Sequence, residues 1–195
     1  MSYRDFTTRT RADFFRCTGS TSCRSLLREV VLGETYQYLF WFRLCQWLRQ
    51  QPLLRLTLYP FAHFFWRRYT YRYGIDIPLA TRIGPGLYLP HFGNIVVHNE
   101  VIIGADCTIS HGVTLGRTNR GLQRGCPTMG DRIFVGPGAK IIGGIRIGSD
   151  VAVGANAVVT HDVPDNAVVA GVPARVVSMQ GSAEYIVRPA AQPRP

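Results

Sequence analysis

Two histidines, His91 and His111, are the side chains of this 195-residue sequence best suited to proton transfer. Imidazole can accept a proton near neutral pH because its ordinary pKa is about 6.5. His91 lies in the stretch LPHFGN, which interrupts an otherwise regular pattern. We interpret His91 as a general base, whereas His111 either orients a substrate or merely lines a groove. We expect the other three histidines to be hydrogen-bonded bystanders: His63, His98 and His161.

A repeat of six residues positions these two histidines. Apolar residues recur in this register at 13 positions between Ile77 and Val159, and seven of them are followed directly by glycine. Such a repeat is typical of a β-helix, in which each repeat forms a short strand and a turn, and the apolar side chains fill the interior. A β-sandwich would instead show turns at a spacing of about 8 to 12 residues. The sequence therefore predicts a mainly β fold, a parallel β-helix of hexapeptide repeats.

The repeat also predicts which residues share one face of the prism. Counting three repeats per coil places four residues in one column: Leu89, Ile109, Val135 and Val153. His91 and His111 each lie two residues beyond this column, so we expect them on the same face in adjacent coils, about 4.8 Å apart. Further along this face come four small residues: Gly136, Pro137, Gly154 and Ala155. His98 begins a different column and should face elsewhere.

Two insertions interrupt the repeat. The first adds two residues between Leu89 and Val97, and the second adds eight between Leu115 and Met129. Insertions in a stacked repeat leave the stack as loops, and loops commonly carry function. The second insertion, around RTNRGLQRGCPT, is polar, and its cysteine Cys126 has no neighbour in sequence that would activate the thiol.

The region before the repeat follows a helical pattern. We expect residues 1–23 to be a poorly ordered basic segment, residues 24–73 to form two or three aromatic, arginine-rich helices, residues 74–177 to form the β-helix, and residues 178–195 to form a tail. The aromatic surface of the helices either packs in a core or subunit contact, or attaches to an anionic membrane surface.

Charge and cysteine usage narrow the class of protein. The net charge of +10 resides mainly in residues 1–73, which hold 12 arginines and 4 acidic residues, so the β-helix carries no nucleic-acid signature. The five cysteines form no CxxC pair. We find no secretory signal and no apolar run of about 18 residues. We therefore expect a cytoplasmic protein, with peripheral contact at the inner membrane face as an alternative, and no nucleic-acid partner.

Five stretches carry a resemblance to a known family: GIDIPLATRIGPGLYLPHFGNIVV, GVTLG, VGPGAKIIGGIRIG, VGANAVV and GVPARVV. Residues 74–177 resemble the serine acetyltransferase branch of the left-handed β-helix (hexapeptide repeat) acyltransferases. They also look like the offshoot of that branch that acetylates capsule or colanic acid sugars. The resemblance implies acetyl-CoA as the donor, no metal, and a homotrimer, or a dimer of trimers, with active sites between adjacent prisms.

The resemblance assigns roles to individual residues. In serine acetyltransferases a histidine acts as general base and an aspartate 15 residues earlier supports it, which corresponds here to His91 and Asp76. A backbone N–H near Gly116 or Arg117 would receive the oxyanion. Cofactor-binding candidates are the small residues that would contact the pantetheine arm and two cations for the CoA phosphates: Gly136, Pro137, Gly154, Ala155, Lys140 and Arg175.

Departures from the family motif concern the acceptor. Pro90 replaces the aspartate before the catalytic histidine, and Pro78 replaces the histidine of the DIH motif. Gly125-Cys126 replaces the Arg-His pair of the flexible loop. Cys126 and His111 remain as candidates for orienting the acceptor. Because the charged partners of serine are missing, we expect O-acetylation of a sugar in a capsular or exopolysaccharide, or of another small hydroxyl acceptor. The first alternative function is serine O-acetyltransfer. A γ-type carbonic anhydrase is a more remote alternative, and a non-catalytic scaffold is a third. The C-terminus lacks the isoleucine that those enzymes insert into cysteine synthase, so we do not expect that partner.

Overall fold

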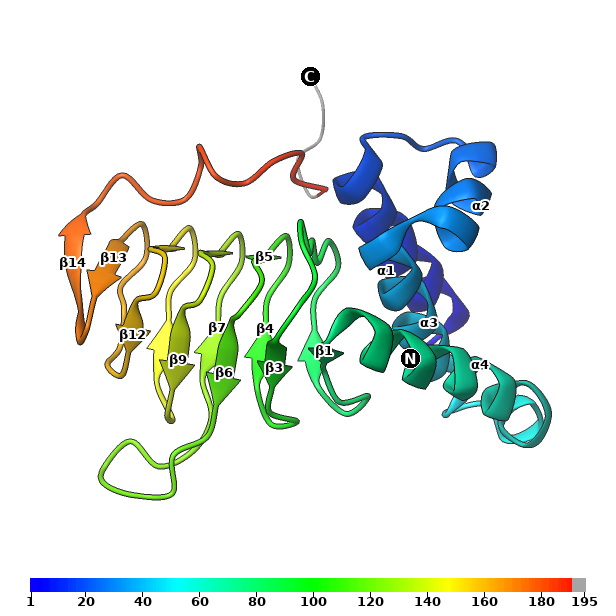
Figure 1. Cartoon of the computed structure of the whole chain (residues 1–195), viewed down its shortest axis with the longest axis horizontal. Helices are drawn as coiled ribbons and strands as arrows, with labels where there is room; N and C mark the ends of the chain where they lie inside the picture. Colours follow the sequence, from blue (N-terminus) through cyan, green and yellow to red (C-terminus); the bar gives the residue numbers. More distant parts are fainter. Residues whose placement is uncertain (191–195) are drawn as a thin grey trace.

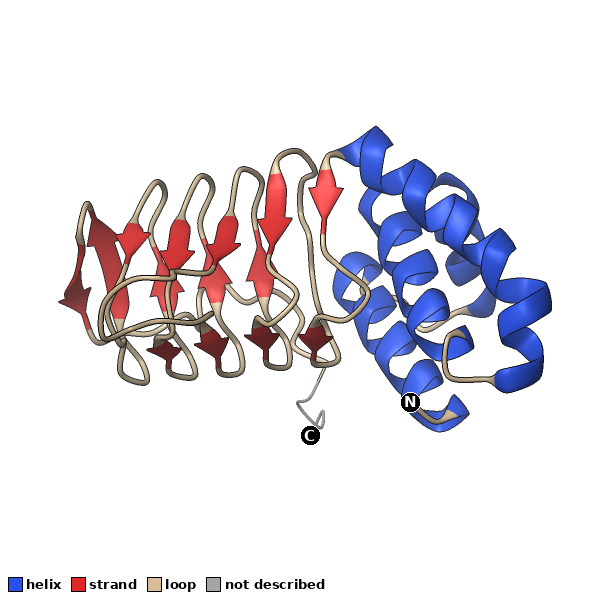
Figure 2. Cartoon of the chain, turned by 90° about the horizontal axis from the view of Figure 1, so that it is seen from below, coloured by secondary structure: helices blue, strands red, loops and turns tan. Residues whose placement is uncertain are grey.

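The computed structural model describes residues 1–190 and consists of a helical region followed by a parallel β-helix (Figures 1 and 2). The terminal residues on which the expectation against cysteine synthase rests lie beyond the described residues. Four helices come first: α1 (Tyr3–Thr18), α2 (Cys23–Leu32), α3 (Glu34–Leu48) and α4 (Pro52–Tyr73). They gather at the N-terminal end of the prism, as Figure 1 shows.

Three sheets form the faces of the prism. Sheet A contains, in spatial order, β1 (Ile75–Asp76), β3 (Ile95–Val97), β6 (Thr114–Gly116), β9 (Lys140–Ile142) and β12 (Val158–Val159). Sheet B contains β2 (Arg82–Ile83), β4 (Ile102–Ile103), β7 (Thr128–Met129) and β10 (Arg146–Ile147). Sheet C contains β5 (Thr108–Ile109), β8 (Phe134–Val135), β11 (Ala152–Val153), β13 (Val168–Gly171) and β14 (Ala174–Ser178). The predicted parallel β-helix is confirmed.

Strand pairing reproduces the predicted columns. Ile109 pairs with Val135, and Val135 pairs with Val153, while an isolated bridge joins Tyr88 to Thr108 and so continues the column to Leu89. The column residues are buried, because each inward-pointing apolar side chain lies on its equivalent in the next coil. Both insertions leave the stack without shifting the register beyond them.

The expectation of a poorly ordered segment at residues 1–23 is wrong, because most of this segment is helix α1. A capping box begins the helix: the Ser2 side chain accepts from the Asp5 backbone N–H, and the Asp5 carboxylate accepts from the Ser2 N–H. Further along, Asp13 forms a fully buried ion pair with Arg43 of α3, with Nε and Oδ2 2.8 Å apart. The polar composition of this segment therefore reflects buried polar contacts and not disorder.

Arginines dock the helices onto the first coils. Arg43 donates to the carbonyl oxygens of Ile83 and Gly84 at 3.0 and 2.7 Å. Buried Arg16 donates to the carbonyl oxygens of Gly86 and Cys107 at 2.9 and 3.1 Å. Two of the arginines in the first 73 residues therefore hold the helices against the β-helix.

One face of α4 remains apolar and exposed. Leu53, Leu56, Phe64 and Tyr71 are 84, 83, 63 and 71% exposed, and their spacing places them on one side of the helix. Within the described part of the chain, no helix combines the length and apolar character needed to cross a bilayer.

The segment after β14 runs back along the prism toward α1 (Figure 1). Ser182 donates its backbone N–H to the Asp150 carbonyl at 3.0 Å, and Ala190 donates its N–H to the Asp106 carboxylate at 2.9 Å. Arg16 Nε donates to the Val187 carbonyl at 3.2 Å. The described part of the predicted tail is therefore bound to the prism and to the helical region.

Candidate active site

His91 and His111 meet at the edge where sheet C passes to sheet A, which we call the histidine edge. Their rings lie edge to face with centroids 5.8 Å apart, and both side chains are exposed. The predicted juxtaposition is thus present. Gly93 and Asn94 have φ values of +111° and +53°, so the chain turns sharply after His91, and Gly112 donates its N–H to the Gly93 carbonyl at 2.8 Å.

The end of α4 supports the turn that carries His91. Gly74, in the left-handed conformation, caps the C-terminus of α4, and its carbonyl accepts the Ile95 N–H at 3.0 Å. The ring of Tyr73 packs against that of Phe92, with centroids 5.1 Å apart. The helical region therefore positions the residue next to His91.

Lys140 lies closer to the histidines than its place in the sequence suggests. Its Nζ donates to the Gly112 carbonyl at 2.5 Å, which anchors an ammonium group one residue from His111. Gly138 donates its N–H to the His111 carbonyl at 2.9 Å, and Asn156 donates to the Pro137 carbonyl at 2.9 Å. The predicted strip of small residues thus continues from His111 along the histidine edge.

Gly136, one of the two glycines in this strip, is required by the packing of the coils. A Cβ at Gly136 would lie 2.8 Å from the Val153 carbonyl oxygen and 2.9 Å from the Ala155 nitrogen. Stacking of adjacent coils therefore requires glycine here, whether or not a ligand binds.

Asp76 lies on sheet A, in register with Val96, and is exposed. Among residues 1–190 no hydrogen bond joins Asp76 to His91. The supporting role of Asp76 stays a prediction.

Three other candidates lie on the opposite edge of sheet A. Gly116 ends β6, and Arg117 and Cys126 begin and end the inserted loop, which closes on itself through two 3.0 Å hydrogen bonds between Thr118 and Gly125. We call this the loop edge. Strand β6 separates it from His111, so these residues do not join His91 within one chain. Arg175 is remote as well: it lies in β14 at the far end of sheet C, and its guanidinium contacts the Ala174 carbonyl.

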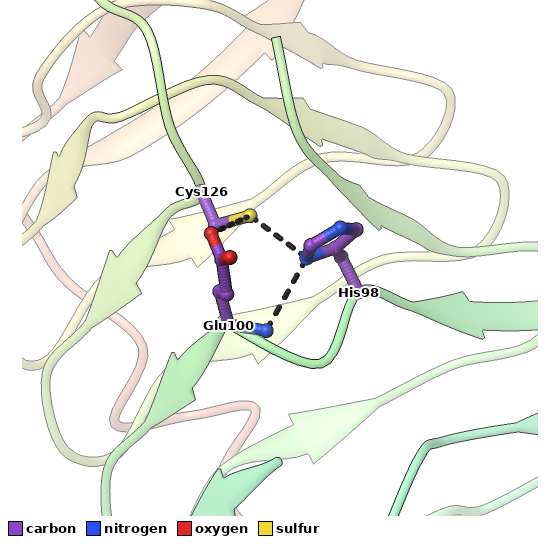
Figure 3. A group of neighbouring side chains, drawn as sticks. All are labelled: His98, Glu100 and Cys126. Carbon is purple, nitrogen blue, oxygen red and sulfur yellow. Dashed lines mark hydrogen bonds between the residues drawn. The ribbon is translucent and has the colours of Figure 1, made fainter. Parts of the chain in front are cut away.

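The loop edge holds a cluster that the sequence interpretation missed (Figure 3). Cys126 Sγ lies 3.1 Å from His98 Nδ1 and 3.9 Å from Glu100 Oε2. Glu100 Oε2 also accepts from Arg117 at 2.7 Å. Partial burial and the Glu100 carboxylate raise the pKa of the Cys126 thiol, so this cysteine is not an activated nucleophile.

A positional signal for this cluster was present in the sequence. Glu100 precedes the column residue Ile103 by three positions, and Cys126 precedes Met129 by three. Because Ile102 pairs with Thr128, these equivalent positions stack in adjacent coils. An inserted loop must return to the edge it left, which brings Cys126 back beside His98.

Comparison with known proteins identifies the family. Residues 127–161 match the family model described as bacterial transferase hexapeptide (six repeats). The serine acetyltransferase of Synechococcus elongatus is 36% identical over 162 residues, which cover 82% of this chain and 64% of that protein. A crystal structure of the Neisseria gonorrhoeae serine acetyltransferase in complex with serine is 31% identical, with a TM-score of 0.70, over 91% of this chain and 71% of that chain. The chain belongs to the serine acetyltransferase branch of the hexapeptide-repeat acyltransferases.

The structure of a second serine acetyltransferase, from Brucella abortus and in complex with coenzyme A, is 30% identical, with a TM-score of 0.70 over 91% of this chain and 68% of that chain. The chain covers only part of the curated serine acetyltransferases that it matches. It spans 64% of the length of the protein from Synechococcus elongatus, 45% of that from Mycobacterium tuberculosis and 61% of that from Helicobacter pylori.

These comparisons overturn the expected polysaccharide acceptor. The relatives and structures bear the name serine acetyltransferase, so the alternative prediction, serine O-acetyltransfer, fits better. The expectation of a changed acceptor rests on the charged groups missing at Pro78, Pro90, Gly125 and Cys126. Four positions are too few to outweigh a similarity that extends over 162 residues.

Proposed function

We propose that this chain transfers the acetyl group of acetyl-CoA to the hydroxyl of L-serine. One observation carries the proposal: His91 stands exposed beside His111 at the turn after α4, on a β-helix whose relatives are serine acetyltransferases. The relative from Brucella abortus binds coenzyme A and that from Neisseria gonorrhoeae binds serine.

The proposed mechanism uses His91 as general base. His91 accepts the proton of the serine hydroxyl while the hydroxyl oxygen attacks the thioester carbonyl carbon. A C–O bond forms, the C–S bond of the thioester breaks, and the CoA thiolate takes the proton back from His91. General base assistance contributes about 10² to 10⁴ in rate, and holding both substrates together supplies the rest.

Lys140 and the adjoining strip of small residues form the donor side of this proposal. The Lys140 ammonium, held by the Gly112 carbonyl, offers a cation at the histidine edge for a phosphate of CoA. Pro137 and Ala155 leave room for the pantetheine arm to run beside the backbone. Arg175, at the far end of sheet C, contributes less to this part of the prism.

A trimer would complete the site. In one chain, the histidine edge and the loop edge lie at opposite ends of β6, so a backbone N–H at Gly116 or Arg117 can meet the oxyanion only from a neighbouring prism. Leu122 in the inserted loop is fully exposed, as a residue that contacts a partner copy would be in the isolated chain. We therefore propose a homotrimer whose active sites pair the two edges.

An assay with purified protein tests the function. Incubation with acetyl-CoA and L-serine should release CoA thiol and form O-acetylserine, detected with a thiol reagent and by mass spectrometry. D-serine and L-alanine serve as controls, because the first misplaces the hydroxyl and the second lacks it. Hydrolysis of acetyl-CoA without O-acetylserine, or turnover of another hydroxyl compound in preference to serine, would contradict the proposal. Light scattering at assay concentration should give three times the chain mass.

We also propose that α4 contacts an anionic membrane surface. Its exposed apolar face lies among four arginines, and the helix contains no acidic residue: Arg55, Arg67, Arg68 and Arg72. A symmetric contact with a second α4 would bring arginine against arginine, whereas anionic lipid complements the charge.

Co-sedimentation with vesicles tests this contact. The protein should pellet with vesicles that contain phosphatidylserine and not with pure phosphatidylcholine. The double change Leu53→Ser and Leu56→Ser should reduce binding, whereas Val177→Ser, at an exposed apolar residue of β14 far from α4, serves as the control. A hexamer that pellets with neither vesicle would favour a dimer of trimers through α4 instead.

A further inference from the structure

We propose that His98, Glu100 and Cys126 bind a divalent cation of the zinc class at the loop edge. Figure 3 shows the three side chains converging from the turn after β3 and from the end of the inserted loop. One ligand atom from each lies within 4.8 Å of the other two. Within one chain this site lies apart from the histidine edge, whereas in the proposed trimer it would face the histidine edge of the neighbouring prism, and metal binding can be measured without acetyl transfer.

The spacing of the ligand atoms matches that of a tetrahedral zinc site. Zinc bonds of about 2.3 Å to sulfur and about 2.0 to 2.2 Å to nitrogen or oxygen set neighbouring ligands about 3.5 Å apart. The separations here are 3.1 Å from sulfur to nitrogen and 3.9 Å from sulfur to carboxylate oxygen. The third pair, the His98 nitrogen and the Glu100 carboxylate oxygen, lies within 4.8 Å, and rotation of the exposed Glu100 side chain can close the remaining distance.

The kinds of ligand select the metal. Thiolate and imidazole favour zinc and other late transition metals over magnesium and calcium, which prefer oxygen ligands alone. Three protein ligands leave a fourth position for water or another small ligand. On binding, the Cys126 S–H bond breaks, its proton passes to water, and the sulfur bonds to the metal as thiolate.

The β-helix holds the ligands in place before a metal arrives. Glu100 and Cys126 occupy equivalent positions in adjacent coils, and the His98 N–H donates to the Leu115 carbonyl at 2.9 Å. The Glu100 backbone N–H also donates to His98 Nδ1 at 3.2 Å, and a bound cation would take the place of this hydrogen bond on the Nδ1 lone pair.

Arg117 is the one charged competitor described at the cluster. Its guanidinium pairs with Glu100, but the two side chains are 36 and 53% exposed, and an exposed ion pair contributes little to stability. A divalent cation can therefore displace Arg117 from Glu100 at small cost. It would also tie the end of the inserted loop to the preceding coil, because Cys126 and His98 would share one ion.

Metal titration of the reduced full-length protein tests the site. Zn²⁺ in competition with a chromophoric chelator should bind at one equivalent per chain, and Co²⁺ should give thiolate-to-metal charge-transfer absorption. Cys126→Ser should abolish that absorption. His98→Ala and Glu100→Gln should each weaken metal binding by at least about tenfold, because the loss of a ligand lowers metal affinity more than the loss of a residue that only hydrogen-bonds to a ligand. Arg117→Ala should tighten binding, because it removes the competitor.

Matched controls make the result decisive. Cys23→Ser and His161→Ala replace an exposed thiol and an exposed imidazole outside the cluster, and both should bind metal as the wild type does. Limited proteolysis should cut the inserted loop more slowly in the presence of Zn²⁺, and Cys126→Ser should remove this protection. Binding that survives Cys126→Ser, binding lost in a control variant, or the absence of stoichiometric binding would each overturn the proposal.

Discussion

The rings of His91 and His111 meet edge to face, 5.8 Å apart, although 20 residues separate them in the chain. One coil of the β-helix accounts for this contact. Both rings are exposed, so changing either should alter chemistry more than folding.

We predict that His91→Ala lowers kcat by about 10² to 10⁴, the usual contribution of a general base. The midpoint of thermal unfolding should change little, because the side chain is exposed. Steady-state kinetics with acetyl-CoA and serine, together with calorimetry, would measure both. His161→Ala is the matched control, and wild-type activity in His91→Ala would exclude His91 as the base.

The buried ion pair between Asp13 and Arg43 should dominate the stability of the helical region. Asp13→Asn leaves the Arg43 guanidinium buried without its counter-charge and should lower the free energy of unfolding by about 3 to 5 kcal/mol. The partly exposed pair of Arg132 and Asp150 provides the comparison, and Asp150→Asn should cost about 1 kcal/mol or less. Denaturant unfolding monitored by circular dichroism would separate the two. Equal losses would contradict this ranking.

Stability should fall in alkali through the buried thiol of Cys107. Burial raises its pKa from 9.0 to about 12. Below pH 9 the thiol is protonated in both states, whereas between pH 9 and 12 only the unfolded chain loses the proton, so unfolding is favoured as pH rises. The added slope approaches 1.4 kcal/mol per pH unit. Cys107→Ala should flatten the pH dependence of unfolding, whereas Cys23→Ala, at an exposed thiol, should leave the slope unchanged.

Gly104 should tolerate no side chain. A Cβ there would approach the Gly130 carbonyl oxygen to 2.2 Å, and backbone in the next coil cannot move aside without unstacking. Gly104→Ala should therefore destabilise the fold by about 1 to 3 kcal/mol, the usual cost of overpacking. Gly154→Ala would meet the Ala170 side chain at 3.2 Å and should cost less. Thermal unfolding of the two variants would test this order, and a reversal would contradict it.

The hexapeptide register predicted the β-helix and the contact between His91 and His111, because stacking is a regular function of residue number. It could not predict what depends on breaks in that regularity. For the cluster of His98, Glu100 and Cys126, the repeat places Glu100 and Cys126 in equivalent positions, but it does not specify that the side chains of all three residues point toward one another. Lys140 reaches the Gly112 carbonyl because its side chain is long, and the hexapeptide register predicts only where each backbone position lies.

The error at residues 1–23 has a different origin. Arginine and threonine without periodicity are typical of disorder when they remain solvated. Here Asp13 and Arg16 are buried against partners 30 or more residues away, so tertiary contacts decide the outcome. Local composition carries no information about such partners.

The two ends of the β-helix are closed by different means. At the N-terminal end, Arg16 and Arg43 occupy carbonyl groups of the first coils with guanidinium donors, and at the C-terminal end β14 pairs with β13 in the antiparallel direction. A stack of parallel coils with open ends would template the addition of further coils from other chains, which is the route to fibrils. The helical region and the final hairpin together restrict growth to sideways association of whole prisms, so the prism can remain concentrated without polymerising end to end.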